Sequence, residues 1–99
     1  MLEIVYRPRA IATLEAIADY TIAQWGAAQA RKYLDDIRRQ IEFAAEYPGS
    51  GSETYGLPPE YRKVRSGSHR IIYRASETEL TVVAIIHERE DVPEDLSED

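Results

Sequence analysis

The chain has 99 residues, a length that fits one compact domain with a single core. Hydrophobic residues make up 43% and charged residues 30% of it, which excludes both a disordered chain and a membrane-embedded one. Cysteine is absent, so disulfides, thiolate catalysis and cysteine-ligated zinc are excluded. No apolar run approaches the roughly 20 residues that span a bilayer, and the N-terminus lacks a signal-peptide pattern. We therefore expect a cytoplasmic protein without membrane contact.

The net charge of −6 is unevenly distributed along the chain. Residues 88–99 carry seven acids and one base, so residues 1–87 are neutral as a group. Residues 61–76 carry no acid at all, and their cationic side chains are Arg62, Lys63, Arg65, Arg70 and Arg74, with His69 beside them. This segregation predicts a basic surface for a phosphate, carboxylate or acidic partner, and an acidic tail that is solubilising and frayed.

Residues 2–7 are predicted to form a short strand, and Pro8 suits the first turn of a helix over 9–25. Gly26 separates this helix from a second periodic run, and the sequence Pro-Gly-Ser-Gly at 48–51 ends it. Apolar positions recur at helical spacing: Ile11, Leu14, Ala18, Thr21 or Ile22, and Trp25 first, then Ala30, Tyr33, Leu34, Ile37, Ile41, Ala44 and Ala45. One glycine between two amphipathic runs predicts an antiparallel helix hairpin, with Trp25 as a packing anchor at its turn.

Three further strands are predicted in the second half of the chain, at residues 61–65, 69–75 and 80–86. The last is the most apolar, so we expect it to be central in the sheet. A Gly-, Ser- and Pro-rich loop over 49–60 precedes them. The order β-α-α-β-β-β predicts an α+β fold in which the helix hairpin packs on one face of a small, mainly antiparallel sheet. The other face would stay open.

Catalytic signatures are scarce. The sequence has no glycine-rich phosphate loop, no dinucleotide fingerprint and no pair of histidines at helical metal-binding spacing. His69 and His87 lie on neighbouring predicted strands, but two histidines without a third ligand do not indicate a metal site. We therefore predict no metal and no cofactor.

The cationic strand residues allow two interpretations. Alternate side chains share a face of a strand, so Arg62 points one way and Lys63 and Arg65 the other. Arginine presents a planar set of donors that suits phosphate or carboxylate groups, which favours a binding surface. Alternatively, these arginines pair with surrounding acids on a solvated face.

Several segments resemble the ParE branch of the ParE/RelE toxin superfamily from bacterial toxin–antitoxin modules. The most specific are the Gly-x-His-Arg strand within 66–74 and the His-x-Arg-x-Asp pattern at the end of 83–91. Further matching positions are Tyr6 to Ala10, Leu14, Ile17, Tyr20, Trp25, Gly26, Gln29, Ala30, Tyr33, Tyr47, Pro48 and Gly51. The resemblance covers residues 3–91, so we assign 1–91 to a single toxin domain and 92–99 to an acidic C-terminal tail.

The resemblance implies a growth-inhibiting toxin that inhibits DNA gyrase, binds no nucleic acid sequence-specifically and is neutralised by a ParD-like antitoxin in a hetero-oligomer. RelE-like relatives instead cut mRNA on the ribosome without a metal, and the matching residues for that chemistry are Lys63, Arg70, His87 and Arg89. Those nucleases commonly carry a tyrosine or histidine near the C-terminus, and residues 92–99 contain neither. A protein-binding inhibitor is therefore favoured over an enzyme, and an inactive antitoxin-binding module remains a third alternative.

Partner binding is expected to use the basic strands and nearby tyrosines. The predicted contact residues are Tyr55, Tyr61, Arg62, Lys63, Arg65, His69 and Arg70. Tyrosine supplies amphipathic contact area, and cations on the sheet would steer an acidic antitoxin tail. We expect Tyr33 and Tyr73 to be buried in the fold instead.

Overall fold

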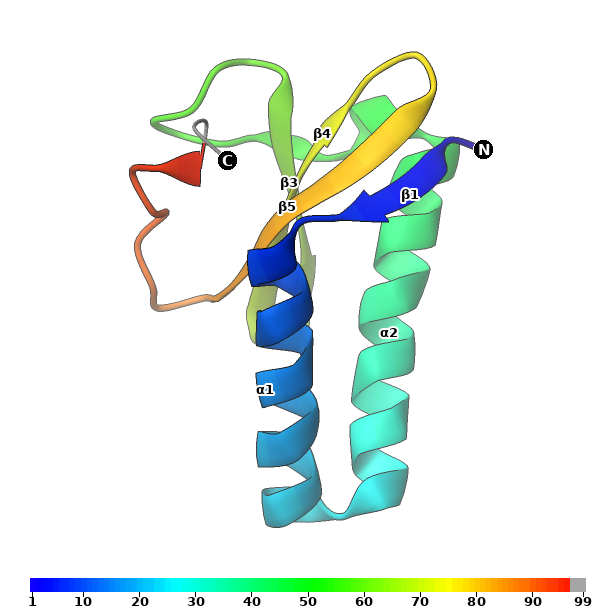
Figure 1. The fold of residues 1–99 in the computed structure, drawn as a ribbon, viewed down its shortest axis with the longest axis vertical. Helices are drawn as coiled ribbons and strands as arrows, with labels where there is room; N and C mark the ends of the chain where they lie inside the picture. Colours follow the sequence, from blue (N-terminus) through cyan, green and yellow to red (C-terminus); the bar gives the residue numbers. More distant parts are fainter. Residues whose placement is uncertain (97–99) are drawn as a thin grey trace.

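A computed structural model describes residues 1–96, which form two helices and a five-stranded sheet (Figure 1). The elements in chain order are β1 (Glu3–Tyr6), α1 (Pro8–Trp25), α2 (Ala27–Glu46), a 3-10 turn η1 (Pro48–Ser50), β2 (Ser52–Glu53), β3 (Tyr61–Ser66), β4 (His69–Ala75) and β5 (Glu79–His87). This confirms the predicted α+β fold and element order. The two-residue strand β2, within the predicted loop, was not foreseen.

The sheet has the strand order β1-β5-β4-β3-β2. Three of its four pairings are antiparallel, and β1 pairs in parallel with β5, with Glu3 opposite Glu79. The most apolar strand, β5, lies inside the sheet, although β4 occupies the middle position. Ile72 pairs with Ala84 and Tyr73 with Val82, so Val83 has no opposite residue and forms a β-bulge.

The helix hairpin forms as predicted around Gly26, whose φ of +91° suits glycine. Its turn lies beyond the end of the sheet, at the tip of the two long helices (Figure 1). The expectation that Trp25 anchors the packing is wrong: it is 71% exposed, because no strand reaches this part of the hairpin. In α1 the fold buries Ile17 and Thr21, whereas Ile11 is exposed. Neither helix has the length and apolar character needed to cross a membrane.

The main core lies between the hairpin and the sheet. Its large buried side chains include Ile37 and Ile41 from α2, Ile71 and Tyr73 from β4, and Leu80, Val82 and Ile85 from β5. The Tyr73 hydroxyl donates to Pro48 O at 2.7 Å and accepts from Gly51 N at 3.1 Å. This tyrosine therefore fixes the loop that leaves α2, and its predicted burial is confirmed at 1% exposure.

The opposite face of the sheet is covered as well. Tyr61, Ile72 and Ile86 form a second buried cluster there with Leu96, which is 0% exposed. In Figure 1 the segment after β5 curls back beside the loop that precedes β3. The expectation of a frayed tail is therefore wrong for residues 92–96, because Leu96 supplies apolar cover that the helices cannot reach. Residues 97–99 lie outside the described part of the chain.

Candidate functional site

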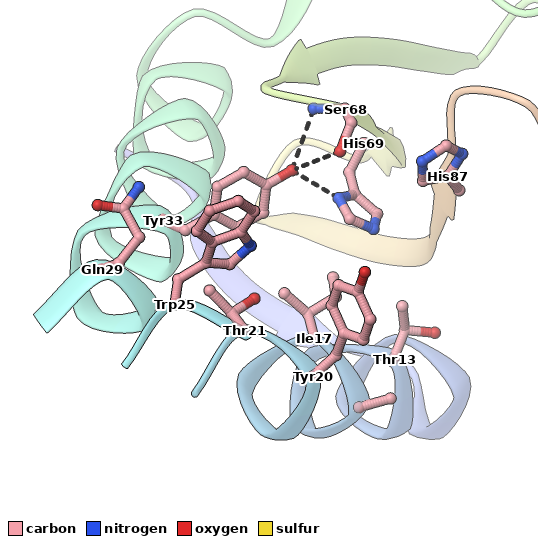
Figure 2. Close-up of a pocket in the computed structure, with 11 residues that line it drawn as sticks. Thr13, Ile17, Tyr20, Thr21, Trp25, Gln29, Tyr33, Ser68, His69 and His87 are labelled. Carbon is pink, nitrogen blue, oxygen red and sulfur yellow. Dashed lines mark hydrogen bonds between the residues drawn. The ribbon is translucent and has the colours of Figure 1, made fainter. Parts of the chain in front are cut away.

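A groove of about 660 Å³ opens between α1, the start of α2 and the ends of β4 and β5. We call it the aromatic groove, and its lining residues are Thr13, Ala16, Ile17, Tyr20, Thr21, Trp25, Gln29, Tyr33, Ser68, His69 and His87. Figure 2 shows side chains from α1 on one side of this groove and Tyr33, His69 and His87 on the other. Apolar and aromatic walls around a few polar groups are typical of a binding site.

Helical spacing explains the wall that α1 contributes. Thr13, Ile17 and Tyr20 follow one another at four- and three-residue steps, so their side chains project on the same face. Tyr20 is 66% exposed and Trp25 is 71% exposed. Two large aromatic rings thus border the groove with most of their surface in solvent.

The opposite wall is built around the Tyr33 hydroxyl of α2. This oxygen lies 2.6 Å from His69 Nδ1 and 3.2 Å from Ser68 Oγ, and it accepts a hydrogen bond from Ser68 N at 3.1 Å. Gly67 permits the approach: its φ is +56°, and a Cβ there would lie 2.6 Å from the Tyr33 ring. The β3–β4 turn is therefore held against the hairpin by one phenol. Tyr33 itself is half-buried, less completely than predicted.

His69 and His87 lie opposite each other on β4 and β5, with ring centroids 5.5 Å apart in an edge-to-face arrangement. Burial is the main cause that lowers the pKa of His69, and the neighbouring His87 lowers it further, against the opposing effect of Glu90 and Glu88. Arg89 N donates to His87 Nδ1 at 3.2 Å, which makes this ring nitrogen an acceptor. Both imidazoles thus face the groove as polar groups held by neighbours.

The predicted cations are mostly engaged within the fold. Arg65 forms an ion pair with Glu88, and Arg62 Nη1 donates to Gly51 O at 2.8 Å. Arg70 Nη2 donates to two backbone oxygens, Glu88 O at 3.1 Å and Glu90 O at 2.7 Å. The alternative of pairing with surrounding acids therefore holds for Arg65, whereas Arg62 and Arg70 are engaged by backbone oxygens instead. Lys63 makes no hydrogen bond or ion pair through its ammonium group with any residue in the described part of the chain.

The two tyrosines predicted to contact a partner lie in different environments. Tyr55 is 97% exposed in the loop before β3. Tyr61 is 2% exposed in the second buried cluster, and Arg74 Nη1 donates to its hydroxyl at 3.1 Å. The placement of Tyr61 at a partner surface is therefore corrected, because residues near Leu96 cover it.

The four residues considered for RNA cleavage are not assembled at one place. His87 lines the aromatic groove on the helix side of the sheet. Lys63 and Arg70 line a separate cavity on the other side, which we call the sheet-face cavity. Arg89 is exposed in the turn after β5. The acid–base candidate is thus separated by the sheet from two of the cations that would stabilise a phosphorane. Among residues 1–96 no three histidine or acidic side chains are grouped to hold a metal ion.

Sequence reasoning identified His69 and His87 but missed most of the aromatic groove. Tyr20 and Tyr33 entered the prediction only as hairpin positions that match the family pattern, and Trp25 only as an expected packing anchor. The available signal was the spacing of Thr13, Ile17 and Tyr20 beside the predicted apolar stripe, since a second aligned row on a helix indicates a second contact surface.

Sequence comparisons with known proteins agree on one family. The family model described as "ParE toxin of type II toxin-antitoxin system, parDE" matches residues 4–92. The chain is 40% identical over 90 residues to Toxin ParE1 of Mycobacterium tuberculosis, covering 90% of this chain and 92% of that one. It is 35% identical to Toxin ParE1 of Caulobacter vibrioides, covering 81% and 82%. A solved structure described as the chromosomal ParDE TA system from P. aeruginosa has the same fold, with a TM-score of 0.73 at 21% identity over 88% of this chain and 96% of that one.

Proposed function

Because the chain belongs to the ParE toxin family of type II toxin–antitoxin systems, we propose that it inhibits DNA gyrase and is neutralised by a ParD-like antitoxin. The aromatic groove is the observation that carries this proposal. Trp25 and Tyr20 border it with most of their surface in solvent, although nothing in the fold requires aromatic residues there. Exposed aromatic rings around a groove are typical of protein–protein contact surfaces. The antitoxin would cover this groove in a cytoplasmic hetero-oligomer.

An amphipathic helix of the antitoxin suits the groove. Such a helix places apolar anchors at three- and four-residue steps, which would pack on Trp25 and Tyr20. The polar wall formed by Ser68, His69 and His87 would meet its backbone or polar side chains. Antitoxin recognition would then depend on apolar contact at the groove, with Tyr55, Lys63 and the neighbouring arginines as a more peripheral surface.

Inhibition by contact is favoured over catalysis. Metal-independent RNA cleavage needs a general base and acid beside cations that stabilise the charge on the phosphate in the transition state. In this chain His87 lies on one side of the sheet while Lys63 and Arg70 lie on the other. A ribosome-dependent endoribonuclease would require a different arrangement of these side chains.

A gyrase supercoiling assay tests the target. The purified protein is expected to inhibit supercoiling at micromolar concentration, and addition of its cognate antitoxin should restore supercoiling. Absence of inhibition would contradict the gyrase assignment. Primer extension on translated mRNA provides the alternative readout, since codon-phased cuts would identify a nuclease. Induction that leaves growth unchanged would identify an inactive antitoxin-binding module.

Substitution of Trp25 tests the groove as the antitoxin surface. Trp25→Ala should weaken antitoxin binding by about 2 kcal/mol in calorimetry, because aromatic anchors dominate such interfaces. Phe43→Ala is a matched control: Phe43 is another half-exposed aromatic residue, on α2, and it does not line the groove. Equal affinities of both variants for the antitoxin would place the interface elsewhere.

A further inference from the structure

The sheet-face cavity has a volume of about 390 Å³ and is separate from the aromatic groove. Its walls are the loop before β3, side chains of β3 and β4, and the segment after β5, which lies beside that loop (Figure 1). Thr54, Lys63 and Arg70 line it, together with Asp91 and Glu94 from the last segment. The proposed antitoxin contact at the aromatic groove does not require this cavity, although Tyr55 and Lys63 of the more peripheral surface also line it.

Two residues that line this cavity each have a buried polar atom without a partner in the described residues. These atoms are Thr54 Oγ1 and Arg70 Nε. Thr54 is only 4% exposed, so its hydroxyl has been removed from bulk water without a replacement hydrogen bond. Leaving a buried donor unpaired is costly, which makes such atoms good indicators of a ligand that completes them.

Hydrogen bonds to the backbone fix the orientation of the Arg70 guanidinium group. Its Nη2 is held by Glu88 O and Glu90 O, so the plane of the guanidinium is fixed by backbone contacts. The Nε–H has no acceptor among the described residues, and an arginine nitrogen can only donate. Lys63, whose ammonium group has no partner among residues 1–96, lines the same cavity and supplies a second positive charge.

We propose that the sheet-face cavity binds one carboxylate group. Arg70 Nε and Thr54 Oγ1 donate to its oxygens, and the Lys63 ammonium group neutralises its charge. A planar carboxylate suits a fixed guanidinium edge, and charge-assisted hydrogen bonds of this kind are among the stronger ones. The site is independent of the aromatic groove and of the target assignment.

The acids at the cavity select a single negative charge. Glu90, Asp91 and Glu94 line it, and the Glu90 carboxylate also accepts a hydrogen bond from His87 N at 2.9 Å. Repulsion from these three acids is about twice as strong for a dianion as for a monoanion, because Coulomb energy scales with charge. A carboxylate therefore fits better than a hydrogen phosphate dianion. It can belong to a free small acid or to an aspartate or glutamate side chain of a polypeptide.

Titration of the full-length, ¹⁵N-labelled protein with sodium acetate tests the site, with sodium chloride at matched ionic strength as the reference. The reporter is the Arg70 side-chain Nε–H resonance, assigned by its loss in Arg70→Lys. Acetate should shift it saturably with a dissociation constant on the order of 1 mM, which is reasonable for so small a ligand. A shift that grows linearly, or one that chloride reproduces, would overturn the proposal.

Two variants separate the contributing groups. Thr54→Val keeps the side-chain shape and Lys63→Met keeps the chain length, and each should weaken acetate binding about tenfold by removing one hydrogen-bonding group. Lys32→Met is the matched control, since Lys32 is an exposed lysine on α2 and does not line this cavity. Acetate affinity unchanged in Lys63→Met would overturn the proposal. Lys63 is only half-buried and its ammonium group has no partner among residues 1–96, so this test stays valid if Thr54→Val fails to fold.

Two further probes identify the class and source of the ligand. N-acetyl-glutamate amide presents the same carboxylate on a peptide-like backbone. Tighter binding than acetate would support the site and assign it to a polypeptide side chain, whereas equal or weaker binding would support it and assign it to a free small acid. Hydrogen phosphate binding more tightly than either would overturn the assignment to a carboxylate.

Discussion

Tyr33 Oη lies 2.6 Å from His69 Nδ1, so a single hydroxyl group on α2 holds the first residue of β4. The same oxygen accepts a hydrogen bond from Ser68 N at 3.1 Å. The phenol can donate its proton to a neutral imidazole while it accepts from the amide. This contact closes one wall of the aromatic groove and joins the helix hairpin to the β3–β4 turn.

Removal of the phenol should therefore destabilise the fold. Tyr33→Phe leaves Ser68 N and His69 Nδ1 without a partner, and we expect the free energy of unfolding to fall by about 1–3 kcal/mol. Urea denaturation measures it. Tyr20→Phe is the control, because Tyr20 is 66% exposed, and its free energy of unfolding should change by no more than about 0.5 kcal/mol. Equal values for the two variants would show that the contact contributes nothing.

The stability of the protein should decrease in mild acid because of His69. Burial, followed by the effect of His87, lowers the pKa of His69 below its ordinary value of 6.5. The unfolded state therefore binds a proton at a higher pH than the folded state does, and stability is lost as pH falls below about 6.5. Above that pH the contribution of His69 is constant.

Urea denaturation between pH 5 and pH 8 measures this dependence. His69→Gln should have a smaller loss of stability across this range, since glutamine does not titrate. An NMR titration that places the pKa of His69 above the value for an unfolded chain would contradict the expectation, because stability would then increase in mild acid.

Gly51 is required for close packing against Tyr73. A Cβ at this position would lie 2.5 Å from Tyr73 Oη and 2.9 Å from Lys63 O. Gly51→Ala should therefore lower the free energy of unfolding by about 1–3 kcal/mol through overpacking. Gly49→Ala is a matched control two residues away, where a Cβ meets nothing within 4 Å. Thermal unfolding compares them, and equal midpoints would show that Tyr73 moves aside without cost.

Leu96 should contribute substantially to stability although it follows the last strand by nine residues. Its side chain is 0% exposed beneath the second face of the sheet, so Leu96→Ala should cost about 2–5 kcal/mol. Ile22→Ala is the comparison, because Ile22 is 49% exposed and should lose about 1 kcal/mol or less. If chemical denaturation gave a smaller loss in the free energy of unfolding for Leu96→Ala than for Ile22→Ala, the segment after β5 would detach readily in solution.

Local sequence patterns were sufficient to predict the helices and four of the five strands. Alternation, residue type and helical spacing are properties of nearby residues, so β1, β3, β4, β5 and the hairpin could be recognised. The parallel pairing of β1 with β5 depends on residues 76 positions apart, such as Glu3 and Glu79, which no local pattern specifies. The exposure of Trp25 depends on how far the hairpin extends past the sheet. The burial of Leu96 against the sheet was not predicted, because a single leucine among acidic residues has no periodicity.

Dependence on residues far apart in the sequence also limited the prediction of the site. His69 and His87 were identified as neighbours on adjacent strands, and the structure places them opposite each other. The sequence could not show that His87 and Arg70 leave opposite faces of the sheet. That depends on the register between β4 and β5, which the bulge at Val83 changes. The engagement of Arg70 with the carbonyl groups of Glu88 and Glu90 likewise follows from how the chain turns after β5.

The pairing of the first strand with the last has a consequence for how the protein is made. β1 and the hairpin are synthesised early, but β1 finds its sheet neighbour only when β5 exists. Contacts over such sequence distances form slowly and leave apolar surface uncovered until they do. The nascent chain therefore cannot complete its sheet until most of it has been translated. A premature stop before β5 would release a helix hairpin with no complete sheet to pack on.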